Sequence, residues 1–156
     1  MGLFGKKKDD EWEQPNPKLD AELARLNALP LPQLAAEVMT KGFSANYDPT
    51  VSPVQADFLV DDFCPRPRLH LFRDTTIRGQ RRAAEELSDP TSTRAKFAQL
   101  EDLLGEGLQA LEKASLVEPK SSFDGVATQV GYVTTRLGRD ALAQNAVDRV
   151  LAGGKL

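Results

Sequence analysis

Cysteine and histidine each occur only once in this chain of 156 residues, as Cys64 and His70. A single thiol cannot form a disulfide within the chain, so the sequence predicts a fold that depends on its hydrophobic core, and it indicates a reducing compartment. No apolar run reaches the ~20 residues that a transmembrane helix needs, and no signal-peptide pattern follows Met1. We therefore expect a cytoplasmic protein without a membrane partner.

Motifs for catalysis and for cofactor binding are also missing. His70 lies in an apolar run between arginines with no nucleophile motif beside it, so we interpret it as a structural histidine. There is no C-x-x-C, H-E-x-x-H or G-x-x-x-x-G-K-[ST] motif, and Gly105-Glu106-Gly107 lacks the preceding strand and the third glycine of a dinucleotide site. The sequence thus predicts a non-enzyme with no cofactor, no metal and no small-molecule substrate.

The charges of the chain are unevenly distributed. The formal net charge is −3 with a pI near 5.2, which argues against a surface dominated by basic residues. Between Arg66 and Arg82, however, six arginines accompany a single carboxylate, Asp74. Arginine forms bidentate contacts with phosphate and carboxylate groups, so this window is a candidate site for nucleic acid or for an acidic protein surface. The alternative is internal pairing with Asp61, Asp62, Glu85 and Glu86.

The first 18 residues combine charges of both signs with Pro15 and Pro17 and contain little apolar surface. Such a segment buries too little to offset its ordering entropy, so we predict a disordered tail over 1–18. We interpret Lys6, Lys7 and Lys8 as part of a solubilising terminus, with a contact to a membrane or to nucleic acid as the alternative.

Residues 19–51 are predicted to form a helical hairpin extension. Leucines recur at helical spacing up to Leu26, and the prolines at 30 and 32 then forbid a continuous helix. A second helix with an apolar stripe follows, and Gly42 is placed to take the left-handed conformation that ends many helices.

Residues 52–156 are predicted to form a single further domain. It opens with Ser52-Pro53-Val54-Gln55, which has the form of a helix-initiating capping box. The helix that follows would carry Asp57 and Asp61 outward. We interpret this pair as a solvated acidic face rather than as a metal site, because no third ligand lies nearby.

A leucine stripe marks the longest predicted helix. From Phe97 to Leu111, apolar residues recur in steps of three and four, so one face is apolar for about four turns. Gly105 and Gly107 are places where this helix could break or kink, and Thr135 is placed to cap the last helix. In order, the expected elements are a helix over 53–63, a strand over 68–72, a helix over 74–88 capped by Asp74 or Thr75, a helix over 92–113, strands from Leu116 and over 129–134 joined by a tip at Phe123-Asp124-Gly125, and a helix over 139–151.

The end of the leucine-striped helix and the hairpin after it carry a known pattern. Leu111-Glu112 is followed by Leu116-Val117, and the return strand leads through Tyr132 to Thr135 and Gly138. This arrangement resembles the C-terminal half of winged helix-turn-helix domains, in which a recognition helix with the pattern L-x-x-L-E-x-x-G-L-V leads into a hairpin ending Y-x-L-T-x-x-G. The resemblance covers roughly residues 52–153 and is best at 108–142.

Two positions depart from the family pattern: Ser115 replaces the glycine at the helix exit, and Thr134 replaces an apolar residue of the second strand. The resemblance implies a mainly α fold with a small β-hairpin, namely a winged-helix-like three-helix core with a helical N-terminal extension. DNA readers of this family place the start of the recognition helix in the major groove and touch phosphates with the wing.

The register of that helix decides what the resemblance implies. A helix that begins at Thr91 or Ser92 presents leading residues that suit bases and phosphates. A helix that breaks at Gly105, or a recognition helix of the usual length before Leu116, presents instead a leading face with three carboxylates, which repel phosphate. These carboxylates are Glu101, Asp102 and Glu106.

We therefore expect a non-enzymatic, winged-helix-like interaction protein that docks on a macromolecular partner through an arginine patch and an acidic helix. The alternative is a DNA-binding transcriptional regulator, with duplex DNA as its partner and a homodimer formed through the helices between Leu19 and Phe43. The candidate residues for binding a protein partner or nucleic acid are Arg66, Arg68, Arg73, Arg78, Arg81, Arg82, Arg94, Lys96, Arg136 and Arg139.

Overall fold

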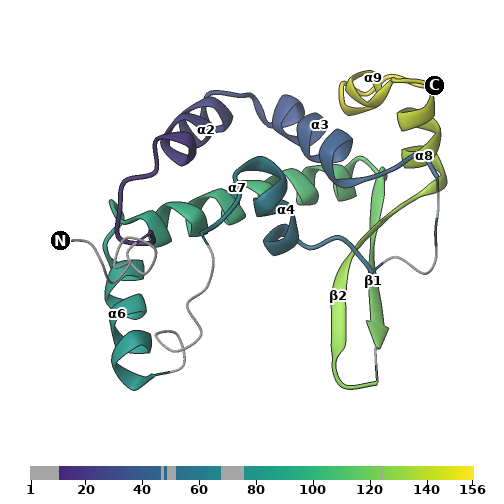
Figure 1. Cartoon of the computed structure of the whole chain (residues 1–156). Coiled ribbons are helices and arrows are strands. Elements are labelled where there is room, and N and C mark those ends of the chain that lie inside the picture. The colour runs from purple at the N-terminus through teal and green to yellow at the C-terminus, as the bar shows by residue number, and fades with distance from the viewer. Residues whose placement is uncertain (1–10, 47, 49–51, 68–75, 124) are drawn as a thin grey trace.

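The computed structural model describes residues 11–46, 48, 52–67, 76–123 and 125–156. Over these ranges the protein is mainly helical with one small antiparallel hairpin, which confirms the expected fold class (Figure 1). The helices are α2 (Pro17–Asn27), α3 (Leu31–Gly42), α4 (Ala56–Phe63), α6 (Ile77–Ser88), α7 (Thr93–Lys113), α8 (Arg136–Ala143) and α9 (Val147–Leu151), and the strands are β1 (Val117–Phe123) and β2 (Thr128–Thr134). None of these helices is long and apolar enough to span a bilayer.

Some expected features lie outside the described residues. They include the strand over 68–72 with His70, the lysines of the first ten residues, and Asp74, Thr75 and Asp124. The helix expected over 74–88 is described from Thr76 onward, where the Thr76 hydroxyl accepts a hydrogen bond from the Gly79 amide at 3.0 Å and α6 begins at Ile77.

Helix α7 is the centre of the fold, and α2, α3, α4 and α6 all pack against it. It begins where the Ser92 hydroxyl accepts a hydrogen bond from the Ala95 amide at 3.1 Å. The helix continues through Gly105 and Gly107 without a break, because tertiary packing outweighs the low helix propensity of glycine. A Cβ atom on Gly107 would lie 2.7 Å from Cγ2 of Val38, so glycine lets α3 approach α7 closely.

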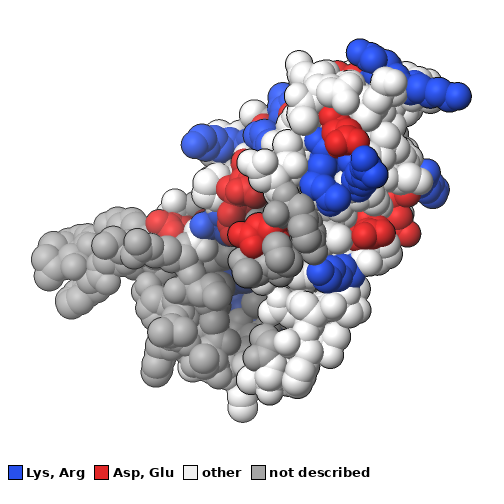
Figure 2. Space-filling view, turned by 90° about the vertical axis from the view of Figure 1, so that its right-hand side faces the viewer, with Lys and Arg blue, Asp and Glu red and all other residues white. Residues whose placement is uncertain are grey.

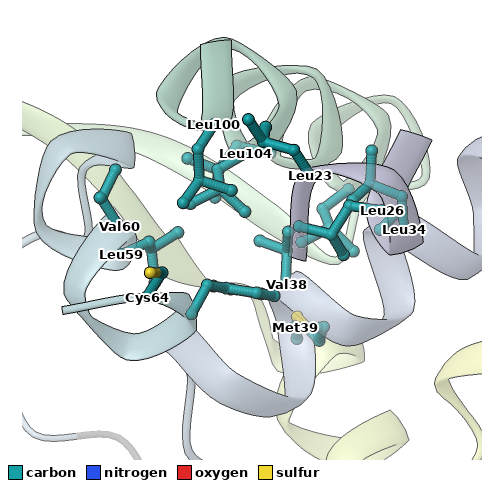
Figure 3. Packing of buried hydrophobic residues seen from close by; sticks show 14 of the residues in the cluster. Leu23, Leu26, Leu34, Val38, Met39, Leu59, Val60, Cys64, Leu100 and Leu104 are labelled. Atoms are coloured by element: carbon teal, nitrogen blue, oxygen red, sulfur yellow. The ribbon is translucent and has the colours of Figure 1, made fainter. Parts of the chain in front are cut away.

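The hydrophobic core lies between α7 and the helices that cover it. Side chains of α2, α3, α4 and α7 point toward one another there, among them Leu26, Val38, Leu59 and Leu104 (Figure 3). The leucine stripe of α7 is buried in this core, as its spacing predicts. Cys64 is also buried, and burial raises the pKa of its thiol.

The segment before α2 is packed on the same core. Trp12 is buried, and its ring meets the Phe97 ring edge to face with the centroids 5.5 Å apart. The Asn16 side chain then caps α2 by accepting a hydrogen bond from the Leu19 amide at 3.0 Å. The part of the predicted tail that the structure describes is therefore ordered against α7 rather than separate from the core.

The left-handed turn predicted at Gly42 is wrong. Gly42 is the last residue of α3, and Phe43 after it is extended with φ −130°. A Cβ atom on Gly42 would lie 2.6 Å from Cδ2 of Leu59. Glycine is therefore suited to position 42 because α4 approaches closely there, and not because the chain makes a left-handed turn.

The capping box predicted at Ser52 is also wrong, because α4 begins only at Ala56 and its N-cap, Gln55, makes no side-chain capping bond. Val54 instead pairs with Tyr132 of β2, through N–H to O hydrogen bonds of 2.8 Å in both directions. The pairing of Val54 with Tyr132 therefore decides the local structure, in place of the capping box that the sequence predicts.

The hairpin follows α7 directly. Ser115 takes the left-handed conformation at the helix exit, with φ 61°, and the Leu116 amide donates to the Leu111 carbonyl at 3.0 Å, which is the bonding pattern of a Schellman helix end. Strands β1 and β2 then pair antiparallel, from Val117 opposite Thr134 to Phe123 opposite Thr128.

The single last helix expected over 139–151 is in fact two helices. The Thr135 hydroxyl caps α8, as predicted, by accepting a hydrogen bond from the Gly138 amide at 3.0 Å. Asn145 then adopts φ 52° and separates α8 from α9. Asparagine tolerates this left-handed conformation better than most residues, so it can end a helix within an otherwise helical pattern.

Candidate macromolecular interface

The basic residues singled out in the sequence do not form one patch. Arg68 and Arg73 lie outside the described residues. The others fall into three groups: those on α6 and at the start of α7, Arg66 just after α4, and those on α8. Helices α6 and α8 lie at opposite ends of α7 (Figure 1), so the two larger groups cannot contact one small ligand together.

Helix α6 carries the most accessible of these residues. Arg78 and Arg81 are exposed, and neither has an ion pair or side-chain hydrogen bond within the described part of the chain. Gly79 is the only buried residue of α6. Two apolar side chains on this helix are also accessible: Ile77 is 78% exposed and Leu87 is 54% exposed.

Arg82 belongs to the same helix but has a partner in the segment before α2. Its Nη2 atom lies 2.8 Å from Oε1 of Glu13. This pair borders a hollow of about 560 Å³ between α6, the start of α7 and the segment around Trp12. The hollow is lined by residues of both charge signs, including Glu85 and Lys96.

The start of α7 is covered by the chain that precedes α2. The Arg94 guanidinium lies over the Trp12 ring, 4.4 Å from its centroid, and Nε donates to Oε2 of Glu86 at 2.5 Å. Lys96 forms an ion pair of 2.6 Å with Asp20. The helix begins at Thr93 after the Ser92 cap, and these two basic side chains near its start are bound within the fold.

Arg66 joins two carboxylates of α4. Its Nη1 atom lies 2.6 Å from Oδ1 of Asp57 and its Nη2 atom 2.9 Å from Oδ2 of Asp61. These bonds hold the pKa of Asp61 below its usual range and raise that of Arg66. For Arg66 the structure thus shows the internal pairing that the sequence left open. Asp57 and Asp61 remain exposed, as expected for a solvated acidic face, and they also pair with this arginine.

The expected acidic face lies along the middle of α7. Asp102 and Glu106 are exposed and Glu101 is half-buried. Burial and the neighbouring carboxylate of Asp57 raise the pKa of Glu101. Because α7 is continuous, this acidic face and the basic start of the helix belong to one element.

On α8, Arg136 is exposed, whereas Nη1 of Arg139 donates to the Thr134 carbonyl at 2.9 Å. Figure 2 views the molecule from this side, and the basic and acidic side chains there lie among each other instead of forming a surface of one sign. The end of the molecule at α8 is therefore not a broad basic surface.

Sequence reasoning missed two features. One is the contact of Trp12 with Arg94, which joins residues that no local pattern relates. The other is the apolar side of the hairpin, where Phe123 is 69% exposed and Val130 is 62% exposed. The lower part of the view in Figure 2, where the hairpin projects, carries almost no charge. The alternation of apolar residues along the two paired strands was the signal for this second feature.

Among the described residues, no group of three or more histidine, cysteine, aspartate or glutamate side chains is arranged to hold a metal ion. Comparison of the chain with family models, with curated proteins and with solved structures gave no match.

Proposed function

We propose that this chain is a non-enzymatic interaction protein that docks on the acidic surface of a partner protein through α6. The observation that carries the proposal is the exposure of Arg78 and Arg81 on a helix that buries only Gly79. We also propose a winged-helix-like core, because α6, a short turn, α7 and the hairpin follow one another in the order that the sequence resemblance implies.

The chemistry of α6 suits a protein surface. Arg78 and Arg81 are three residues apart, so they project from neighbouring positions of the helix. Ile77, four residues before Arg81, adds exposed apolar area next to it, whereas Leu87 faces a hollow that Trp12 and Phe97 also line. Arginine is enriched among the residues that contribute most to protein interfaces, and apolar contacts beside it exclude water from its ion pairs. The exposed carboxylates Asp102 and Glu106 of α7 are the second part of the proposed surface.

The alternative is a DNA-binding regulator, and one observation favours it. Helix α7 begins at Thr93 after a Ser92 cap, which is the register that would bring its leading residues to a major groove. Against it stand the ion pairs of Arg94 with Glu86 and of Lys96 with Asp20, because DNA phosphates would have to displace these carboxylates.

Fluorescence anisotropy with two labelled probes separates the two proposals. A polyglutamate peptide represents an acidic protein surface, and a generic duplex represents DNA. Both are titrated across a salt series with the wild type, with the Arg78→Ala/Arg81→Ala variant, and with Arg136→Ala at the other end of α7 as the control.

For a protein-docking role we expect the peptide to bind at low salt, the double variant to weaken binding about tenfold or more, and the control to match the wild type. Failure of the peptide to bind, or equal binding by the double variant, contradicts the proposal. Duplex binding with a steep dependence on salt, whose log–log slope falls by roughly two in the double variant, favours the regulator.

A further inference from the structure

The outer side of β2 has hydrogen-bonding groups that point away from β1. Tyr132 uses both its N–H and its C=O for Val54, at 2.8 Å each. Successive residues of an antiparallel strand direct these groups to opposite sides, so Thr128 and Val130 also direct theirs outward. The carbonyl of Thr134 agrees with this pattern, because it accepts a hydrogen bond from Arg139.

The neighbouring segment leaves this edge after a single pair of residues. Val54 pairs with Tyr132, and the chain then turns into α4 at Ala56. Within the described part of the chain, Val130 and Thr128 have no backbone partner on that side. No described segment therefore pairs with β2 at the position where a strand through Val54 would have continued.

A hollow of about 300 Å³ occupies this position. Its walls come from β2, from the start of α4 and from α7, and include Val130, Leu108 and Gly105. Apart from its chain neighbours and the backbone of α7 itself, no atom lies within 4 Å of the place where a Cβ on Gly105 would stand, so α7 leaves room there. Val130, which lines the hollow, lies on the same face of the two strands as the exposed Phe123.

The hollow is acidic. Asp57 and Glu101 both line it. Asp57 is paired with Arg66, but Glu101 has no ion pair within the described residues. Burial and Asp57 raise the pKa of Glu101 and Arg66 lowers it, so a further cation beside Glu101 would favour its ionised form. An occupant of this hollow should therefore be extended in its backbone and positively charged.

We propose that the outer edge of β2 binds an extended, basic segment of a partner protein as a third antiparallel strand. Its backbone pairs with Val130 and Thr128, and a lysine or arginine of the segment lies against Glu101. Peptides commonly bind to open sheet edges in this way. A second copy of this chain fits less well, because pairing two β2 edges would bring the Glu101 carboxylates of both copies toward one interface. This surface does not involve α6 and is independent of the function proposed there.

The test uses a labelled, acetylated hexapeptide that alternates lysine with valine, titrated into the full-length protein. Val130→Pro removes an outward N–H that takes no part in pairing with β1, so the hairpin should persist. Ser121→Pro makes the same change at the residue opposite Val130, on the far edge of β1. We expect Val130→Pro to weaken binding about tenfold and Ser121→Pro to leave it unchanged. Circular dichroism of both variants checks that they are folded.

A charge variant provides a second measurement that does not alter the strand. Glu101→Gln should weaken binding of the lysine peptide about threefold to tenfold and reduce its dependence on salt. Asp102→Asn, on the same helix but outside the hollow, should not. A peptide that alternates glutamate with valine should bind more weakly than the lysine peptide.

Three results would overturn the inference. They are equal binding by Val130→Pro and the wild type, equal binding of the two peptides, and a dimer in sedimentation equilibrium that Val130→Pro dissociates. The last result would assign the edge to a second copy of the chain. None of these measurements depends on Arg78 or Arg81, so failure here is distinguishable from failure of the α6 proposal.

Discussion

Helices α6 and α7 are neighbours in the chain and begin in the same way, yet they differ in how much they bury. Thr76 caps α6 through the Gly79 amide at 3.0 Å, and Ser92 caps α7 through the Ala95 amide at 3.1 Å. The apolar stripe of α7 is buried, whereas α6 buries only a glycine. The caps thus locate the two helices, and the spacing of large apolar residues decides which of them is part of the core.

This difference indicates where function is to be sought. A helix that contributes a whole face to the core is constrained by packing. A helix that contributes little to the core can carry residues chosen for a partner. The comparison leads to four predictions, in order of decreasing change in stability.

Truncating one leucine on each helix tests most directly whether α6 contributes less to the core than α7. Leu104 of α7 has no exposed surface, and Leu87 of α6 is half exposed. Leu104→Ala should lower the free energy of unfolding by about 2–5 kcal/mol, because it leaves a cavity. Leu87→Ala should change it by no more than about 0.5 kcal/mol. Urea unfolding measures both, and equal effects would show that α6 is as much a part of the core as α7.

The two glycines of α7 allow an open and a closely packed position to be compared within one helix. Gly105→Ala should stabilise the fold by about 1 kcal/mol, because alanine favours the helix and nothing lies within 4 Å of the new Cβ. Gly107→Ala should destabilise it by about 1–3 kcal/mol, because the Cβ would lie 2.7 Å from Val38. Thermal unfolding of the two variants in parallel should give shifts of opposite sign; shifts of the same sign would contradict the close packing of α3 on α7.

Removing each of the two helix caps shows how much the start of each helix contributes to the stability of the whole molecule. Ser92→Ala should lower global stability by about 1 kcal/mol, because the Ser92 hydroxyl both caps α7 and donates to the Glu86 carbonyl. Thr76→Ala should speed amide hydrogen exchange in the first turn of α6 and leave the global midpoint nearly unchanged. A large global effect of Thr76→Ala would indicate that α6 unfolds together with the core.

The smallest effects are expected from two carboxylates near Arg66, with opposite dependence on pH. The folded-state pKa of Asp61 is lowered by Arg66, so Asp61 stabilises the fold above its unfolded pKa and this contribution is lost as pH falls through the folded value. Asp61→Asn should therefore cost less than about 1 kcal/mol at neutral pH and nothing in strong acid.

Glu101 should show the reverse behaviour. Its folded-state pKa is raised by burial and by Asp57, so its ionised form opposes folding at neutral pH, and this penalty disappears as pH falls below its ordinary value. Glu101→Gln should stabilise the protein at neutral pH and converge with the wild type in acid. Urea midpoints of the two variants between neutral and acid pH should move in opposite directions relative to the wild type.

The helices and the hairpin were largely predictable because their signals are local. The leucine spacing of α7, the Ser92 start and the Thr135 cap each depend on residues within a few positions of one another. The predictions failed where distant residues decide the structure. Val54 pairs with Tyr132 instead of opening a helix, and Gly42 meets Leu59 instead of making a turn.

The candidate site was less predictable than the fold for the same reason. The charge run after Arg66 is evident in the sequence, but a sequence does not show which arginines are already paired. The partner of Arg82 is Glu13, and the ring over which Arg94 lies belongs to Trp12. Only after these contacts are known do Arg78 and Arg81 stand out, among the described residues of the run, as exposed arginines without an ion pair.

The proline at position 119 gives the two-stranded ribbon an asymmetry with consequences for assembly. Pro119 lies opposite Tyr132. Its backbone nitrogen, which has no hydrogen to donate, therefore faces the outer edge of β1, where an added strand would need a hydrogen-bond donor. With this donor missing, the outer edge of β1 should pair with an added strand less readily than the outer edge of β2 does. Fibril growth by strand addition needs two open strand edges on every unit, and the proline weakens the second edge of this hairpin.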